Sequence, residues 1–218
     1  MARQKNKPTK RITALSLLIG AALVILIGAV YVILQPSGNG QGNLAQKQSS
    51  GDAPSKPYNS GKMITFVIKK PLALPDLKFK DGTGADRTMA DWRGKTVLIN
   101  LWATWCAPCR HEMPALARLD KALEKEPFDV VAISIDRKGL PASKKFLTEI
   151  NVAEQLGLYV DPTSRVSQAL KVYGLPVSVL VDPQGREIGR LTGPAEWDSP
   201  DALRLIRAAM AGRLKQGG

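Results

Sequence analysis

The chain contains two cysteines, Cys106 and Cys109, in the segment Trp105-Cys-Ala-Pro-Cys109. A thiolate can attack a disulfide of another protein, and a second thiol three residues on can attack the mixed disulfide and release that protein. The segment follows an apolar, strand-like run and precedes residues at helical spacing. Backbone N–H groups at a helix N-terminus stabilise an anion, so we expect a lowered pKa for the Cys106 thiol. The pattern predicts Cys106 as nucleophile and Cys109 as resolving cysteine.

Other uses of a Cys-x-x-Cys pair fit the sequence less well. A zinc site needs four ligands, and the chain has no further cysteine and one histidine, His111, so no metal site is predicted. Covalent haem attachment requires a histidine where Arg110 stands. A purely structural disulfide across so short a loop would stabilise the fold little. We therefore expect a redox-active disulfide, Cys106–Cys109, and no bound cofactor.

The hydrophobic pattern predicts an α/β domain in which strands and helices alternate. Expected strands cover 63–68, 96–102, 129–135, 177–181 and 187–191, short strand-like pieces meet at Asp81-Gly82 within 71–91, and expected helices cover 107–126, 143–150, 163–172 and 201–213. A parallel pair joined by a helix, then a hairpin and a last helix, gives a central mixed sheet with helices on both faces. The pieces before residue 96 form an amino-terminal hairpin extension of this three-layer fold.

The first 62 residues differ in character from the rest of the chain. Residues 12–34 carry no charge and would span roughly 34 Å as a helix, enough to cross a bilayer. Basic residues in 1–11 place that end in the cytoplasm. A cleaved signal peptide is the alternative, although its apolar part would be about 7 to 15 residues. We expect a single-pass anchor in the inner membrane, a flexible linker at 35–62 and a domain at 63–218 on the periplasmic side.

The formal net charge of +12 is concentrated near the amino terminus. Residues 1–62 hold eight Lys or Arg and one Asp, which leaves 23 basic and 18 acidic side chains in residues 63–218. This balance is ordinary for a protein surface. No basic run interleaved with aromatic residues occurs there, so nucleic acid is not an expected partner.

The stretch from Asn100 to Pro114, Asn-Leu-Trp-Ala-Thr-Trp-Cys-Ala-Pro-Cys-Arg-His-Glu-Met-Pro, resembles the TlpA-like family of membrane-anchored, thioredoxin-fold reductases. The resemblance extends to the segments 174–176, 181–185 and 193–197. It implies that Pro176 is a cis-proline facing the disulfide and that the Leu175 backbone pairs with an extended substrate; an ordinary trans turn is the alternative.

Two further residues are candidates beside the cysteines. The resemblance places a carboxylate, Glu112, near the active site as a candidate for pKa tuning, whereas a solvated helix charge is the alternative. Trp105 is expected as an exposed platform that contacts substrate, and Trp102 as part of the core. Thioredoxin has a buried aspartate where this chain has Asn100, so a carboxylate base from that strand is missing.

The resemblance implies a protein disulfide reductase that serves cytochrome oxidase copper-site or cytochrome c maturation. Expected clients are a copper metallochaperone, an oxidase subunit or apocytochrome c, and the expected electron donor is a membrane protein of the thiol-transporting type. A Sco-like copper-binding chaperone, a dithiol oxidant of the same fold and a thiol peroxidase are the alternatives. The motif alone does not fix the direction of electron flow.

Overall fold

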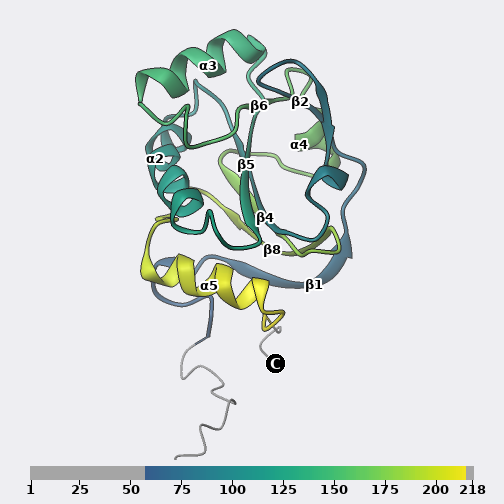
Figure 1. The fold of residues 1–218 in the computed structure, drawn as a ribbon, viewed down its shortest axis with the longest axis vertical. Helices are drawn as coiled ribbons and strands as arrows, with labels where there is room; N and C mark the ends of the chain where they lie inside the picture. The colour runs from purple at the N-terminus through teal and green to yellow at the C-terminus, as the bar shows by residue number, and fades with distance from the viewer. Residues whose placement is uncertain (1–56, 215–218) are drawn as a thin grey trace, which may run out of the picture. The chain divides into compact units, whose positions relative to one another are not determined.

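The computed structural model describes residues 57–214 (Figure 1). The expected cytoplasmic segment 1–11, the expected membrane anchor 12–34 and most of the expected linker lie outside the described residues. Within 57–214, no helix is both long enough and apolar enough to cross a membrane.

One eight-stranded mixed sheet organises the domain, with the strand order β1-β8-β7-β4-β5-β6-β2-β3. The strands are β1 (Val67–Ala73), β2 (Lys78–Asp81), β3 (Asp86–Thr88), β4 (Thr96–Trp102), β5 (Phe128–Ser134), β6 (Tyr159–Val160), β7 (Val177–Val181) and β8 (Arg186–Thr192). The central strands β4, β5 and β6 run parallel, whereas β7 and β8 run antiparallel to their neighbours. The sheet is therefore mixed, as predicted.

Helices cover both faces of this sheet. The helices are α2 (Ala107–Ala122), α3 (Gly139–Glu149), α4 (Arg165–Ala169) and α5 (Pro200–Met210), with short 3-10 turns η1 (Gly61–Met63) and η2 (Met89–Trp92). Every residue of β4 is buried, because its side chains alternate between two cores. Leu98 and Trp102 pack with residues of α2, α3 and α5, while Val97, Ile99 and Leu101 pack with residues of α4 and β2. The predicted three-layer α/β architecture is confirmed.

The amino-terminal extension lies at both edges of the sheet. The predicted hairpin is present as β2 and β3, and it pairs with β6 at one edge. The strand expected at 63–68 was wrong, because Met63 lies in η1 and the strand β1 begins only at Val67. Met63 and Phe66 are both buried, three residues apart, which is helical rather than strand spacing. Strand β1 instead pairs with β8 at the opposite edge and is mostly exposed.

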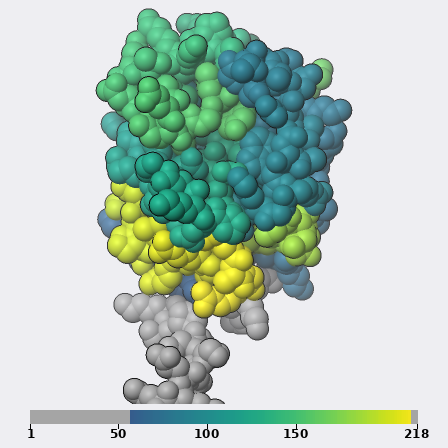
Figure 2. All heavy atoms as spheres, in the orientation of Figure 1, coloured from purple at the N-terminus to yellow at the C-terminus, as the bar shows by residue number. Residues whose placement is uncertain are grey.

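The ribbon view places α3 and β2 at the top of the domain and α5 and β1 at the bottom (Figure 1). The space-filling view shows the same division of the surface: α5 in yellow below, α3 in green and the β2–β3 region in blue above (Figure 2). Residues 57–62, whose composition groups them with the linker, are hydrogen-bonded to the domain, since the Lys62 N–H donates to Asp201 in α5.

Candidate active site

The cysteine motif lies at the edge formed by the carboxyl ends of the parallel strands, which is distinct from the lateral edges at β1 and β3. Strands β4, β5 and β6 are parallel, so the segments that follow them leave the sheet at the same edge. These segments are 103–106, 135–138 and 161–164. Strand β7 runs antiparallel to β4, and Val177 pairs with Leu101, so β7 begins at this edge too. In open α/β sheets, ligands bind beyond the carboxyl ends of the parallel strands, which is where these segments meet.

Cys106 and Cys109 form a disulfide in the structure, with an S–S distance of 2.03 Å. Cys106 is the N-cap of α2, and its sulfur accepts the backbone N–H of Cys109 at 3.3 Å. Pro108 fits in the first turn because that turn does not use its N–H. Cys106 keeps 6% of its surface exposed, whereas Cys109 is fully buried. A client sulfur can therefore approach Cys106 more readily than Cys109, while the roles of nucleophile and resolving thiol stay predictions.

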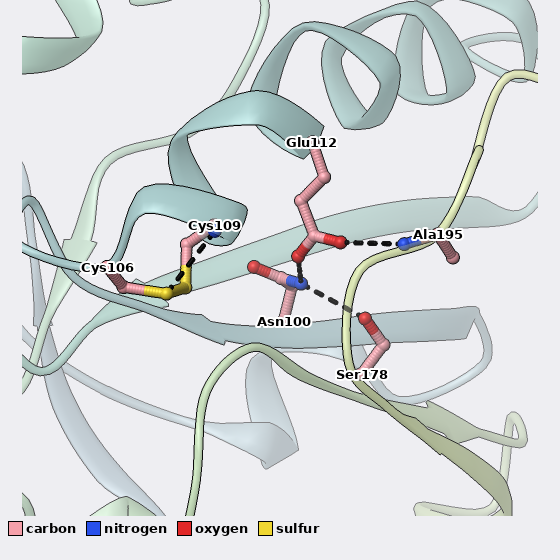
Figure 3. The surroundings of a disulfide bond; sticks show 6 residues. All are labelled: Asn100, Cys106, Cys109, Glu112, Ser178 and Ala195. Atoms are coloured by element: carbon pink, nitrogen blue, oxygen red, sulfur yellow. Dashed lines mark hydrogen bonds between the residues drawn. A yellow bond between two sulfur atoms is a disulfide. The ribbon is translucent and has the colours of Figure 1, made fainter.

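Glu112 lies one helical turn beyond Cys109, and its carboxyl group points into the domain (Figure 3). Its exposed fraction is 3%, so it is not a solvated helix charge. One carboxyl oxygen accepts from Asn100 Nδ2 at 2.7 Å and the other from the Ala195 N–H at 3.2 Å. Burial raises the pKa of Glu112 to about 7, and these two hydrogen bonds oppose the rise only in part. Glu112 can therefore gain or lose a proton near neutral pH.

Asn100 connects Glu112 to the neighbouring strand and faces the cysteines. Its Nδ2 donates to Glu112 and also to Ser178 Oγ, at 3.0 Å, because Asn100 and Ser178 are paired across β4 and β7. Its Oδ1 is buried without a hydrogen-bond partner among residues 57–214, and it points toward the disulfide (Figure 3). The position that holds a buried aspartate in thioredoxin therefore anchors the Glu112 carboxyl group here.

Leu175 and Pro176 precede β7 at the edge that carries the cysteines. The peptide bond between them is cis, the isomer that the resemblance implies. The Pro176 carbonyl accepts from Gly193 N–H, which follows β8. By the register of β7 on β4, Pro176 lies beside Trp102, four residues before Cys106. The structure thus brings Pro176 to the same edge of the sheet as the disulfide, while its contact with a substrate stays a prediction.

Trp105 and the segment around it are held by a contact that the sequence did not indicate. The Trp105 side chain is 69% exposed, as expected for a platform, whereas Trp102 is fully buried. Beside Trp105, the Thr104 hydroxyl donates to Asp136, which follows β5. Burial tends to raise the pKa of Asp136, but the hydrogen bonds from Thr104 and the Lys138 N–H outweigh it and the pKa is lowered. Asp136 therefore stays ionised and fixes the turn that leads into Cys106.

The sequence did not predict two hydrogen-bond partners of this buried pair, Ser178 for Asn100 and Ala195 for Glu112. One signal was available, because Ser178 is the only polar residue in the apolar strand β7 and Asn100 is the only amide in β4. Such isolated polar residues in buried strands need partners, and adjacent strands place them opposite one another. The contribution of Ala195 is a backbone N–H, which no side-chain pattern reveals.

Comparison with known proteins agrees with this geometry. The model of the AhpC/TSA family matches residues 72–186. The thiol-disulfide oxidoreductase ResA of Geobacillus thermodenitrificans is 32% identical over 123 residues, which cover 55% of this chain and 67% of that protein. ResA of Bacillus subtilis is 29% identical over 134 residues, which cover 61% of this chain and 73% of that protein.

A solved structure extends the similarity to the fold. The crystal structure of a putative thiol:disulfide interchange protein DsbE from Chlorobium tepidum aligns with a TM-score of 0.58 and 28% identity, and covers 65% of this chain and 98% of that chain. The matched family model spans β4, the disulfide, α2 and β7. The chain therefore belongs to the AhpC/TSA family and is a thiol-disulfide oxidoreductase of the thioredoxin fold.

Proposed function

We propose that this oxidoreductase is a membrane-anchored reductase of disulfides in extracytoplasmic proteins. The observation that carries the proposal is the unequal exposure of the two cysteines: Cys106, next to the exposed Trp105, keeps 6% of its surface exposed, and Cys109 is fully buried. A macromolecular disulfide needs an accessible nucleophile on a surface that can receive a chain segment, and an internal thiol that resolves the product. Both are present at the edge where Pro176 precedes β7.

The exchange proceeds in two displacements. The Cys106 thiolate attacks one sulfur of the client disulfide, a Cys106–client bond forms, and the other client sulfur leaves as a thiolate. Cys109 then loses its proton and attacks Cys106, which releases the second client thiolate. Two electrons have passed to the client, and the Cys106–Cys109 disulfide remains. A further turnover requires a dithiol donor, for which a membrane protein of the thiol-transporting type is proposed.

The sequence supports a location outside the cytoplasm. The uncharged stretch 12–34 and the basic residues before it would hold the chain in the inner membrane, with the catalytic domain on the periplasmic side. An oxidising compartment keeps an unassisted pair of thiols as a disulfide, so a reductase there needs the donor just described. By resemblance to TlpA-like proteins, the proposed clients are a copper metallochaperone, an oxidase subunit or apocytochrome c.

The direction of electron transfer tests this proposal. The full chain, purified in a mild detergent and reduced, is mixed with a disulfide-bonded protein such as insulin, and the oxidised chain is mixed in parallel with a reduced, unfolded protein. We expect rapid release of client thiols in the first mixture and slow disulfide formation in the second. Faster oxidation than reduction would contradict the reductase function and favour the dithiol oxidant.

A further inference from the structure

A hollow with a volume of about 470 Å³ is lined by Trp105, the residue before Cys106. We call it the Trp105 groove, and its lining residues are Trp105, Ile135, Asp136, Arg137, Lys138 and Ser164. These residues come from the segments that follow β4, β5 and β6, which the parallel strands bring to one edge. Most of its accessible surface is apolar, with Trp105 and Ile135 as its large apolar side chains. A chain segment that presents a sulfur to Cys106 would therefore lie next to this groove.

The exposed charges around the groove are positive. Arg137 and Lys138 line it, and Arg165 follows the lining residue Ser164; all three are exposed. None of the ion pairs within residues 57–214 includes these three cations. The carboxylate that lines the groove, Asp136, is buried and accepts from Thr104 and from the Lys138 N–H. The Asp136 carboxylate is therefore hydrogen-bonded within the domain and is not one of the exposed charges of the groove.

A second hollow, of about 340 Å³, has further positive charge at the start of α2. Its lining includes Ala107, the residue after Cys106, together with Arg110, His111 and Phe146. The Arg110 guanidinium lies over the Phe146 ring, 5.2 Å from its centroid, and has no carboxylate partner among the described ion pairs. The two chain neighbours of Cys106, Trp105 and Ala107, thus each line a hollow that also includes cationic side chains.

Many other exposed cations of the domain have carboxylate partners. Lys62, Lys80 and Arg118, for example, each form an ion pair within 2.7 Å. Exposed charges of one sign around a cleft raise the local concentration of oppositely charged molecules and their association rates, an effect that salt suppresses. Complementary charge also selects between partners, because like charges placed together oppose binding.

We propose that the Trp105 groove binds an extended client segment in which acidic residues flank the reacting cysteine. This inference rests on the proposed reductase function and adds the chemical class of the client. In such a complex, carboxylates of the client lie near Arg137, Lys138 and Arg165, and an apolar client side chain covers Trp105 and Ile135. The client sulfur then stands over Cys106, and exchange proceeds by the two displacements already described.

Matched peptides test the inference with the full chain in its reduced form. Each of three peptides carries one cysteine, which is linked by a disulfide to the same small thiol. The peptides differ only in the residues on either side of that cysteine, which are aspartate, alanine or lysine. We expect the acidic peptide to react at least about 10-fold faster than the basic one at low ionic strength, with the ratio falling toward one as salt shortens the screening length. The measurement is the second-order rate of peptide-thiol release.

Charge-reversal variants test whether Arg137 and Lys138 cause the preference for the acidic peptide. The double variant Arg137→Glu, Lys138→Glu is expected to invert the ratio of acidic to basic rates. The control variant Lys70→Glu, Lys125→Glu changes the net charge equally at exposed positions in β1 and after α2, and it is expected to keep the wild-type ratio. Equal rates for all three peptides, or an equal change in both variants, would overturn the inference and leave the reductase function standing. Failure of all three peptides to react would instead count against the reductase function itself.

Discussion

The Cys106→Ser variant is expected to lose disulfide exchange almost completely, by about a thousand-fold or more, because a serine hydroxyl does not ionise near neutral pH and a thiolate is the required nucleophile. The Cys109→Ser variant is expected to complete the first displacement and then stop. Its Cys106 keeps the small exposed surface of the parent chain, but no second thiol is present to release the client. The result is a stable mixed disulfide between Cys106 and the client.

Two readouts separate these outcomes. A chromogenic small disulfide reports the initial attack, and non-reducing electrophoresis followed by mass spectrometry identifies the trapped complex. The two variants serve as controls for each other, since each removes one sulfur from the same disulfide. If Cys106→Ser trapped clients and Cys109→Ser did not, the roles assigned to the two sulfurs would have to be exchanged.

The Glu112→Gln variant is expected to change how the exchange rate depends on pH. Glutamine resembles the protonated carboxyl group, and the pKa of Glu112 is raised by burial to about 7. Below about pH 6 the variant and the parent chain should therefore react at similar rates. Above pH 7 the parent has an ionised carboxylate that can accept a proton from the reacting thiols, and the variant should be slower by about 10- to 100-fold.

The matched control for this variant is Glu154→Gln, because Glu154 is an exposed glutamate with the same chemistry. Rates are measured from pH 5 to 9 with one small disulfide, which avoids changes in client charge. If Glu112→Gln and the parent chain shared one pH profile, Glu112 would have no part in proton transfer or in tuning the thiol pKa values. Its buried hydrogen bonds would then serve only the fold.

The same substitution has a consequence for stability. Because the folded-state pKa of Glu112 lies above its ordinary value of 4.5, the folded state holds this proton more tightly than the unfolded chain does. The resulting stability is fully present below pH 4.5 and is lost as the pH rises through about 7. In Glu112→Gln this pH dependence is expected to disappear, so its free energy of unfolding should change less than the parent's between pH 5 and 8 in urea titrations.

The local order of strands and helices could be predicted because it depends on short-range patterns. Strand β4 and strand β7 were located at their observed bounds, since both are continuous apolar runs. Helix α2 was predicted to reach Glu126, but it ends at Ala122, and the next residue, Leu123, turns its side chain into the core. Strand β6 was missed because two residues carry no pattern.

The pairing of the outer strands and the hydrogen bonds of Asn100 and Glu112 depend on contacts between segments that are distant in the sequence. No local pattern shows that β1 pairs with β8 while β2 pairs with β6. For the same reason, the sequence placed Glu112 near the cysteines by resemblance only. Its burial follows from the register of β4 on β7, which sets Ser178 beside Asn100, and from the loop after β8, which brings the Ala195 N–H to the carboxyl group.

The reduction potential of the Cys106–Cys109 pair decides most directly whether this protein is a reductase. The full chain is equilibrated against glutathione or thioredoxin redox buffers, and the fraction of disulfide is followed by thiol alkylation and mass spectrometry. For a reductase we expect a value near or below about −200 mV, in the range of reducing thioredoxin-like proteins. A value near about −120 mV, as in a strong oxidant, would contradict the reductase function, because the pair would then draw electrons from client thiols.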